Sequence, residues 1–138
     1  MNEDDIYDAL DNDENESIMK LTSSKIKQYK NDILQKLQLK GKELKEIHKK
    51  LKEYRYCIDM RDIRYGFFIR WISLKNPDKI KLTNGAWVAD VLLYKDGIQI
   101  LLKNKNKLFK IKFDECIIFQ KLSAQEKIIL TVLDYLEK

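Results

Sequence analysis

The chain has 138 residues, of which 44 % are hydrophobic and 36 % charged, and its formal net charge is +5. This length suits one small domain with an appendage, and no apolar run approaches the roughly 18 residues that a membrane-spanning helix needs. The two cysteines, Cys57 and Cys116, and the single histidine, His48, are too few for a standard zinc site, which the sequence therefore excludes.

The first 16 residues contain eight carboxylates and no Lys or Arg. Self-repulsion and few apolar groups predict a disordered acidic tail for residues 1–16. Ile6, Tyr7 and Leu10 lie at helical spacing, which leaves open a short recognition segment that folds on a partner. An acidic start is the opposite of a signal peptide, so we expect a cytoplasmic protein. The remainder of the chain is strongly basic, which favours binding of polyanions, and the tail could compete for the same surface.

Residues 17–60 are predicted to be a basic amphipathic helix. Apolar residues recur at heptad spacing, which is typical of a coiled-coil seam: Leu37, Leu44, Ile47, Leu51 and Tyr54. A phase break after Ile33 and the helix-weakening Gly41 predict either one kinked helix or two helices that meet near residues 40–41. Two interpretations stay open for the seam: it packs on the protein's own barrel, or it forms a homo-oligomer.

From Arg64 onwards the sequence is rich in aromatic and β-branched residues, which favour strands. Turn signals at Asn84-Gly85, Asp96-Gly97 and Asn104–Asn106 separate the apolar runs. The five predicted strands span 64–74, 86–94, 98–103, 107–113 and 116–120, and 79–83 is a candidate for a short edge strand. Closely spaced strands with short turns predict an antiparallel meander that closes into a small SH3-like or Sm-like β-barrel.

The C-terminal segment is predicted to be a capping helix. Ser123 and Glu126 have the spacing of a capping box, and apolar residues line one face of the helix that follows: Ile129, Val132, Leu133 and Leu136. We expect this helix to cover the open end or an edge of the barrel. The predicted fold class is therefore α+β, with an acidic tail at 1–16, a helix at 17–60 and a barrel with its C-terminal helix at 61–138.

No residue constellation in the sequence indicates catalysis. The four glycines are isolated, so no phosphate-binding loop is present, and His48 lies among lysines with no nucleophile beside it. Asp90 is an acid within an apolar strand, and it is expected to point outward and pair with a lysine on a neighbouring strand. A catalytic role would need a second carboxylate beside it. We therefore expect a protein that is not an enzyme and needs no cofactor.

The basic strands supply the candidate binding residues. Phe109, Ile111 and Phe113 are expected on one face of their strand, with Lys110 and Lys112 on the other. Candidate phosphate contacts are Arg64, Arg70, Lys103, Lys105, Lys107, Lys110 and Lys112, and candidate stacking groups are Tyr65 and Trp71. The competing interpretation is that the aromatic residues fill the core and the lysines protect strand edges from mispairing.

Two stretches carry a family resemblance: "NGAWVADVLLYKDGIQILLKN" (84–104) and "IKFDECIIFQKLSAQEKIILTVLDYL" (111–136). Within residues 64–138 the chain resembles small proteins encoded by giant nucleocytoplasmic large DNA viruses of the mimivirus-like group. The resemblance implies a cytoplasmic setting, in the host cytoplasm or the virion, and it supplies no catalytic residue.

These observations favour a non-enzymatic binding protein that contacts nucleic acid, or another polyanion such as an anionic protein, through a basic barrel face and helix. The alternative is a structural or assembly protein that oligomerises through the heptad helix. Neither hypothesis involves a membrane.

Overall fold

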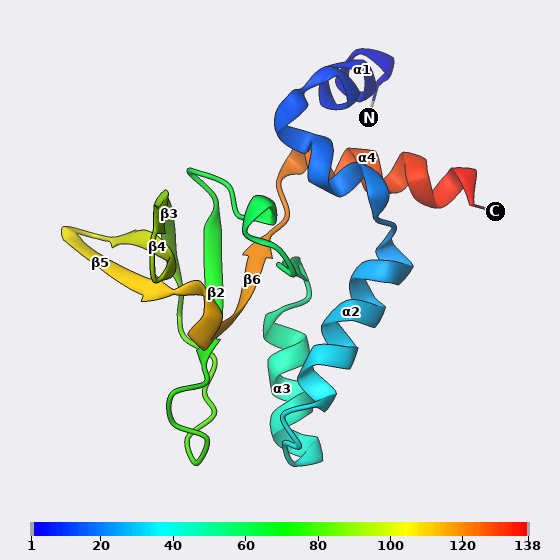
Figure 1. The fold of residues 1–138 in the computed structure, drawn as a ribbon. Coiled ribbons are helices and arrows are strands. Elements are labelled where there is room, and N and C mark those ends of the chain that lie inside the picture. The colour runs from blue at the N-terminus through cyan, green and yellow to red at the C-terminus, as the bar shows by residue number, and fades with distance from the viewer. Residues whose placement is uncertain (1, 138) are drawn as a thin grey trace.

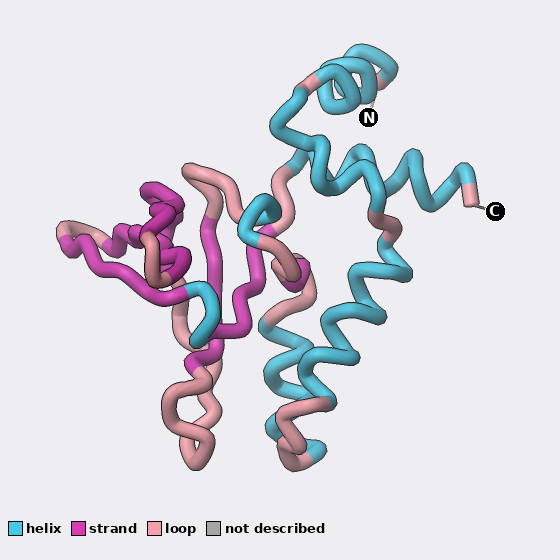
Figure 2. Tube along the Cα trace, viewed as in Figure 1, coloured by secondary structure: helices cyan, strands magenta, loops and turns pink. Residues whose placement is uncertain are grey.

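The structure, a computed structural model that describes residues 2–137, is an α+β fold with its strands on one side and its helices on the other (Figures 1 and 2). Its strands are β1 (Tyr54–Tyr56), β2 (Phe68–Ser73), β3 (Ala86–Tyr94), β4 (Gly97–Asn104), β5 (Lys107–Lys112) and β6 (Cys116–Lys121). The α-helices are α1 (Glu3–Asp11), α2 (Ser23–Gln35), α3 (Gly41–Lys50) and α4 (Ala124–Leu136), and the 3-10 helices are η1 (Asp13–Lys20), η2 (Met60–Asp62) and η3 (Phe113–Glu115). The α+β class is confirmed. Residues 1 and 138, the outer ends of the acidic tail and of the C-terminal domain, lie outside the described residues.

The strands form one antiparallel sheet in the order β1-β6-β2-β3-β4-β5. The predicted five-stranded barrel is wrong: the sheet has six strands, and its edges β1 and β5 do not pair within residues 2–137. The sheet instead curls until β5 faces β2, where the rings of Phe109 and Trp71 lie 6.0 Å apart. Side-chain packing closes this core, which also includes Ile69, Ile100 and Leu102, each fully buried. The curled sheet thus excludes water without hydrogen bonding between its two edges.

Strands β3, β4 and β5 form the predicted meander with two-residue turns, and β3 has the predicted bounds. The predicted edge strand at 79–83 is reduced to a single bridge, in which Leu82 pairs with Ile72 of β2. Ala86 also pairs with β2, at Ile69, so Asn84-Gly85 interrupts one run along β2 and does not form a hairpin. The hairpin prediction failed there because both flanking segments pair with the same neighbouring strand.

The predicted long helix is two helices, α2 and α3, which lie side by side (Figure 1). The phase break therefore marks a helix–loop–helix, the second of the two expected outcomes, and Gly41 begins α3. The helix prediction is wrong from Leu51 onwards, because residues 54–56 form β1 against β6. Tyr54 and Tyr56 alternate with Arg55 across the two sides of the sheet, which is a strand pattern within the heptad pattern.

The helix pair covers one side of β1, β6 and β2. Leu34 and Leu51, both fully buried, pack in one cluster with Ile72, Ile117 and Phe119 of the sheet. This burial supplies the second core of the protein. No helix in the described part of the chain has the length and apolar composition needed to cross a bilayer.

Residues 2–20 are ordered as α1 and η1, so the prediction of a disordered tail is wrong for this segment. Ala9 and Ile18 are fully buried in a third cluster with Ile129 and Leu130 of α4. The buried Asn15 donates hydrogen bonds from Nδ2 to the carbonyl of Ala9 and, across to α4, to Gln125 Oε1. The few apolar residues of the acidic segment are thus enough to dock it.

Helix α4 begins with the predicted capping box of Ser123 and Glu126. It packs mainly against α1 and η1, and not over the end of a barrel. At its other end Asp134 accepts hydrogen bonds from the backbone N–H of Ser23 at 2.9 Å and from the hydroxyl of the same residue at 2.5 Å, which stabilises the first turn of α2. The sequence analysis predicted that α4 would pack on the barrel, whereas in the structure its main partner is the N-terminal segment.

Candidate nucleic-acid interface

The outer side of β3, β4 and β5 forms a continuous surface that we call the open face. Its members follow from strand alternation and register, since their neighbours Val88, Ile100 and Leu102 point into the core. In Figure 1 the α-helices lie on the β6 side of the sheet, away from β3–β5. The open face consists of Trp87, Asp90, Leu92, Tyr94, Gln99, Leu101, Lys103, Leu108, Lys110 and Lys112.

A β-bulge at Ala89 determines which residues of β3 belong to this face. Val88 pairs with Leu102 and Asp90 pairs with Leu101, so one extra residue separates them. Both Trp87 and Asp90 therefore point outward, although their positions differ by three, an odd number that would otherwise put them on opposite sides of the strand. The carboxylate of Asp90 accepts a hydrogen bond from the backbone N–H of Val91 at 2.8 Å. In the described chain Asp90 forms no ion pair with a lysine, and it belongs to no group of three or more acidic, histidine or cysteine side chains that could hold a metal ion.

Trp87 is the largest exposed aromatic side chain of the open face, with 54 % of its surface accessible. Lys103 of β4 lies directly opposite it. The ring of Phe68 supports the indole ring from β2 in an edge-to-face arrangement, at 5.0 Å between centroids and an interplanar angle of 74°. Phe68 in turn packs against the core beneath the helix pair. The indole ring of Trp87 is therefore supported on the side of Phe68 and open to solvent on its other side.

Gly85 makes this arrangement possible. Its φ of +101° is in the region that favours glycine. A Cβ at this position would lie 2.5 Å from the carbonyl oxygen of Ile69 and 2.5 Å from the ring of Phe68. The Asn84-Gly85 dipeptide therefore gives Phe68 the space in which it supports Trp87.

Tyr94 and Lys110 form a second aromatic–lysine pair at the other end of the face. The Lys110 ammonium donates a hydrogen bond to the Tyr94 hydroxyl at 3.1 Å and lies 5.4 Å from the centre of its ring. Tyr94 is 44 % exposed. Between the two aromatic residues β3 carries the exposed Asp90 and the half-buried Leu92, and the half-buried Leu101 lies opposite Asp90 on β4. The 63 % exposed Leu108 lies on β5, opposite Lys103.

The β4–β5 turn extends the basic character of the open face. Lys105, with a φ of 56°, and Asn106 make the turn, and Lys107 begins β5. A cavity of about 450 Å³ at this turn is lined by Asn104, Lys105, Asn106, Lys107 and Phe109. Another cavity, of about 470 Å³, lies beside the N-terminal segment and is described below. The open face thus carries three exposed lysines, Lys103, Lys110 and Lys112, and one carboxylate, Asp90, with Lys105 and Lys107 at the adjoining turn. Near Lys112 a cavity is also lined by Asp96, Asp114 and Glu115, so the basic character is strongest toward the β4–β5 turn, which favours anionic ligands there.

The structure brings five of the predicted phosphate contacts together: Lys103, Lys105, Lys107, Lys110 and Lys112. Arg70 lies on β2, where its Nε donates to the carbonyl of Thr83 at 2.8 Å. Arg64 and Tyr65 precede β2, and Arg64 Nη2 donates to the carbonyl of Asp13 at 3.3 Å. Tyr65 is 80 % exposed, but it belongs to this loop and not to the open face.

Trp71, the other predicted stacking group, is in the core. It is 8 % exposed and packs against Phe109 inside the curled sheet. The prediction of Trp71 as a ligand contact is therefore wrong, because on β2 it shares the inward side with Ile69. The sequence analysis did not propose Trp87 as a ligand contact. Ala86 and Val88, the apolar residues on either side of it, point inward, and strand alternation from them would have predicted an outward Trp87.

The predicted oligomerisation residues pack within the protein's own fold. Ile47, Leu51 and Tyr54 are buried in the cluster beneath the helix pair, and Leu37 and Leu44 pack against its border. Of the two interpretations of the seam, the structure shows the one in which the helix folds onto its own sheet. These side chains leave little surface for a second chain.

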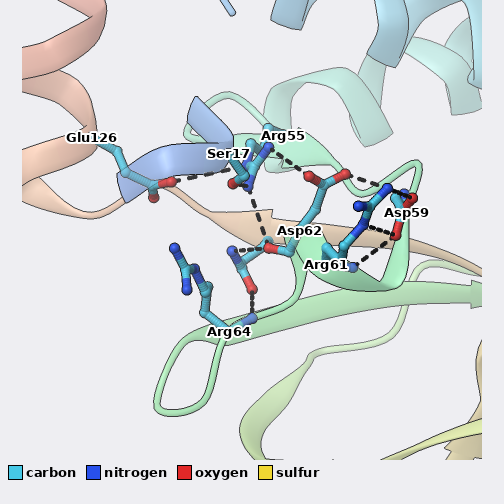
Figure 3. Close-up of polar contacts among 8 residues, drawn as sticks. Ser17, Arg55, Asp59, Arg61, Asp62, Arg64 and Glu126 are labelled. Carbon is cyan, nitrogen blue, oxygen red and sulfur yellow. Dashed lines mark hydrogen bonds and ion pairs between the residues drawn. The ribbon is translucent and has the colours of Figure 1, made fainter. Parts of the chain in front are cut away.

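A polar network beneath the N-terminal segment is the other candidate site (Figure 3). Arg55, 2 % exposed, donates from Nη2 to Ser17 Oγ at 2.6 Å and to the carbonyl of Asp62 at 3.3 Å. Its Nη1 lies 3.6 Å from Asp62 Oδ1, and its Nε lies 4.0 Å from Glu126 Oε2. Burial raises the pKa of Glu126, and the capping-box hydrogen bonds and Arg55 oppose this effect. Sequence analysis did not single out Arg55.

This network connects η1, β1, η2 and α4. Gln120 of β6 extends it, since its Nε2 donates to the carbonyl of Asp62 and its Oε1 accepts from the backbone N–H of Arg64. The adjoining cleft of about 470 Å³ is lined by acidic and basic groups together: Asp13, Glu16, Ser17, Lys20, Asp59, Arg61, Asp62 and Arg64. The lining carries four carboxylates and three cationic groups, so charges of opposite sign face one another across the cleft, and the network is best described as a structural junction.

The remaining reactive groups do not form a chemical site. Cys57 and Cys116 are free thiols, and burial raises their pKa values to about 12 and about 11. His48 is partly buried, and burial together with the charge of Lys30 lowers its pKa. Among residues 2–137 no group of three or more His, Cys, Asp or Glu side chains is arranged to hold a metal ion.

Comparisons with models of protein families, with curated proteins and with solved structures find no match. The resemblance of residues 64–138 to proteins of giant viruses therefore stays a prediction. The class of protein must be inferred from the fold and the open face alone.

Proposed function

We propose that this protein binds nucleic acid through the open face and the adjoining β4–β5 turn. The observation that carries the proposal is the placement of three exposed lysines on an uncovered, partly apolar sheet surface, Lys103, Lys110 and Lys112, with Lys105 and Lys107 exposed at the adjoining turn. Ammonium groups at these positions neutralise phosphates and release the counterions condensed on them, which supplies affinity for any nucleic-acid sequence.

The acidic N-terminal segment lies away from the open face, so it does not cover the proposed binding surface. Helix α1 packs on α4, at the far end of the molecule from β5 in Figure 1. Arg64, Tyr65 and Arg70 lie outside the open face, and the proposal does not depend on them. The alternative of assembly through the heptad seam has less support, because Ile47 and Leu51 are buried within the chain.

The test is the salt dependence of binding. A variant with Lys103, Lys110 and Lys112 changed to Gln removes three charges from the open face. A control with Lys25, Lys27 and Lys36 changed to Gln removes three exposed charges from α2 and its C-terminal cap. Binding of a fluorescent oligonucleotide is measured by anisotropy between 50 and 200 mM salt.

Each lost phosphate contact should lower the slope of log K against log salt by about 0.7–0.9, so the open-face variant should lose about two to three units of slope. The α2 control should stay close to the wild type. Equal losses in the two variants would show attraction by net charge alone. Binding that does not change with salt would refute the proposal.

A further inference from the structure

Resting on this proposed function, we propose that the open face selects single-stranded nucleic acid, with Trp87 and Tyr94 as the side chains on which bases stack. Each of the two rings is exposed, and each has a lysine beside it. Lys103 lies opposite Trp87 in the register of β3 and β4, and Lys110 contacts Tyr94 at 3.1 Å. The same combination of a stacking group and a phosphate contact thus occurs twice on one surface.

The Trp87 ring has the properties of a stacking platform. Phe68 holds it edge-to-face at 5.0 Å from one side, and 54 % of its surface remains accessible to a ligand. An indole fixed in this way loses little side-chain entropy when a base stacks on it. Every base has a π-face, so this contact gives affinity without sequence preference.

The leucines of the open face favour unpaired bases over a duplex. Leu92, Leu101 and Leu108 gain free energy only if apolar ligand atoms cover them. A duplex presents phosphates and sugars outward and hides the faces of its bases in the stack, so it offers the leucines only the small apolar surface of its sugars. A single strand turns its bases toward the rings and leucines and its phosphates toward the lysines around them.

The separation of the two rings sets the length of the site. Trp87 and Tyr94 are seven residues apart on β3, one of which is accommodated by the bulge at Ala89. At about 3.3 Å per residue this corresponds to roughly 20 Å. A stacked strand rises about 3.4 Å per nucleotide and an extended one rises more, so the face accommodates about four to six nucleotides. This is within the range for single-strand binding folds.

The two tryptophans of the chain provide a direct test, since Trp71 is buried and Trp87 is exposed. In a Trp71→Phe variant, Trp87 is the sole tryptophan. Its emission should be quenched by a thymidine or uridine dodecamer and unchanged by heparin, which is a polyanion without bases. A duplex of the same length should bind at least tenfold more weakly than the single strand.

Substitution of the ring tests stacking without relying on Trp71→Phe, which changes a core residue. Trp87→Ala should weaken dodecamer binding roughly 5- to 150-fold, the factor that corresponds to one base–aromatic stack. Its heparin affinity should change less than twofold, and Trp87→Phe should recover part of the loss. Tyr135→Ala, which removes a 73 % exposed aromatic ring from α4, is the matched control and should bind as the wild type does.

The outcomes separate this inference from the proposed function. Salt-sensitive binding of heparin and dodecamer that is insensitive to Trp87→Ala would overturn the inference and leave the proposed function standing. Duplex binding as tight as single-strand binding would do the same. Absence of binding to every polyanion would overturn both.

Discussion

One side of the sheet has two halves that differ in what covers them. Over β1, β6 and β2 the outward residues are Ile72, Ile117 and Phe119, and the helix pair buries them with Leu34 and Leu51. Over β3–β5 the same side of the sheet carries the open face, where apolar residues alternate with lysines and no helix lies above them in Figure 1. The covered half contributes stability, whereas the open half leaves its aromatic rings free for a ligand.

The boundary between the halves is a pair of aromatic rings. Phe68 packs on the covered core and supports Trp87, which is exposed. Phe68, which is anchored in the covered half, therefore fixes the position of Trp87 in the open half. From this comparison we expect substitutions in the covered half to change folding and those in the open half to change binding.

The largest effect should come from Leu51→Ala. Leu51 is fully buried between the helix pair and the sheet, and removing it leaves a cavity. Chemical denaturation should show a loss of about 2–5 kcal/mol in the free energy of unfolding. The matched change in the open half is Leu108→Ala, at 63 % exposure, which should alter stability by less than about 0.5 kcal/mol. Similar losses in the two variants would mean that the open half is also covered.

The next effect should come from Gly85→Ala at the boundary. The new methyl group would overlap the Ile69 carbonyl and the Phe68 ring at a φ of +101°, so stability should fall by about 2–4 kcal/mol. Displacement of Phe68 should also weaken nucleic-acid binding through Trp87. Gly41→Ala, at a site with open space around it, is the control and should raise stability by up to about 1 kcal/mol. Thermal unfolding and the dodecamer assay measure the two consequences.

Lys30→Met tests how the covering helices are fixed to the sheet. Lys30 is 5 % exposed, and its ammonium donates to the carbonyls of Leu51 at 2.8 Å and Tyr54 at 3.1 Å. These carbonyls follow the end of α3, and loss of their donor should cost about 1–3 kcal/mol. Lys27→Met on the exposed side of α2 should change stability by less than about 0.5 kcal/mol.

The difference in free energy of unfolding between the wild type and Lys30→Met should also depend on pH. Burial, and to a lesser extent the charge of Lys27, lowers the pKa of Lys30 from its usual 10.5. Between the lowered pKa and 10.5 the unfolded chain binds more protons than the folded chain. The stability of the wild type relative to Lys30→Met should therefore rise with pH across that window. A difference that falls with pH would contradict the burial of the ammonium group.

The open half could be predicted from sequence better than the covered half. In 109–112 apolar residues alternate with lysines, because one side of β5 faces the core and the other faces solvent. Residues 71–72 and 117–119 are apolar on both sides, since β2 and β6 have a core above and below, so alternation could not assign their faces. That ambiguity placed Trp71 on the surface.

Other features depend on contacts that local sequence does not specify. Tyr54 fits the heptad pattern as well as the strand pattern, and only pairing with β6 decides between them. Arg55 is buried because Ser17, Asp62 and Glu126 come together from distant parts of the chain. The sequence therefore predicted strands β2 to β6, the capping box and the lysine cluster, and it missed strand β1, the open sheet edges, the docked N-terminal segment and Trp87.

The smallest effect should come from Glu126→Gln, which tests the junction at the β1 edge of the covered half. The substituted amide would keep an oxygen to accept the capping-box hydrogen bond from the backbone of Ser123, and Arg55 would keep Asp62 at 3.6 Å. The variant should therefore stay within about 1 kcal/mol of the wild type at neutral pH. Burial raises the pKa of Glu126 above its usual 4.5, so its stabilising contribution is complete below that pH and is lost as the pH rises through the folded-state pKa.

Glu53→Gln provides a control of opposite sign for this pH dependence. Glu53 is exposed, and its hydrogen bond and ion pair with Lys127 lower its pKa from the usual 4.5. Its contribution is therefore present above pH 4.5 and is lost on acidification through the lowered pKa. Denaturation curves from pH 3 to 8 should show the wild-type advantage falling with pH against Glu126→Gln and rising with pH against Glu53→Gln. If both differences rise with pH, Glu126 is not buried, and the N-terminal segment does not close over Arg55 as the structure shows.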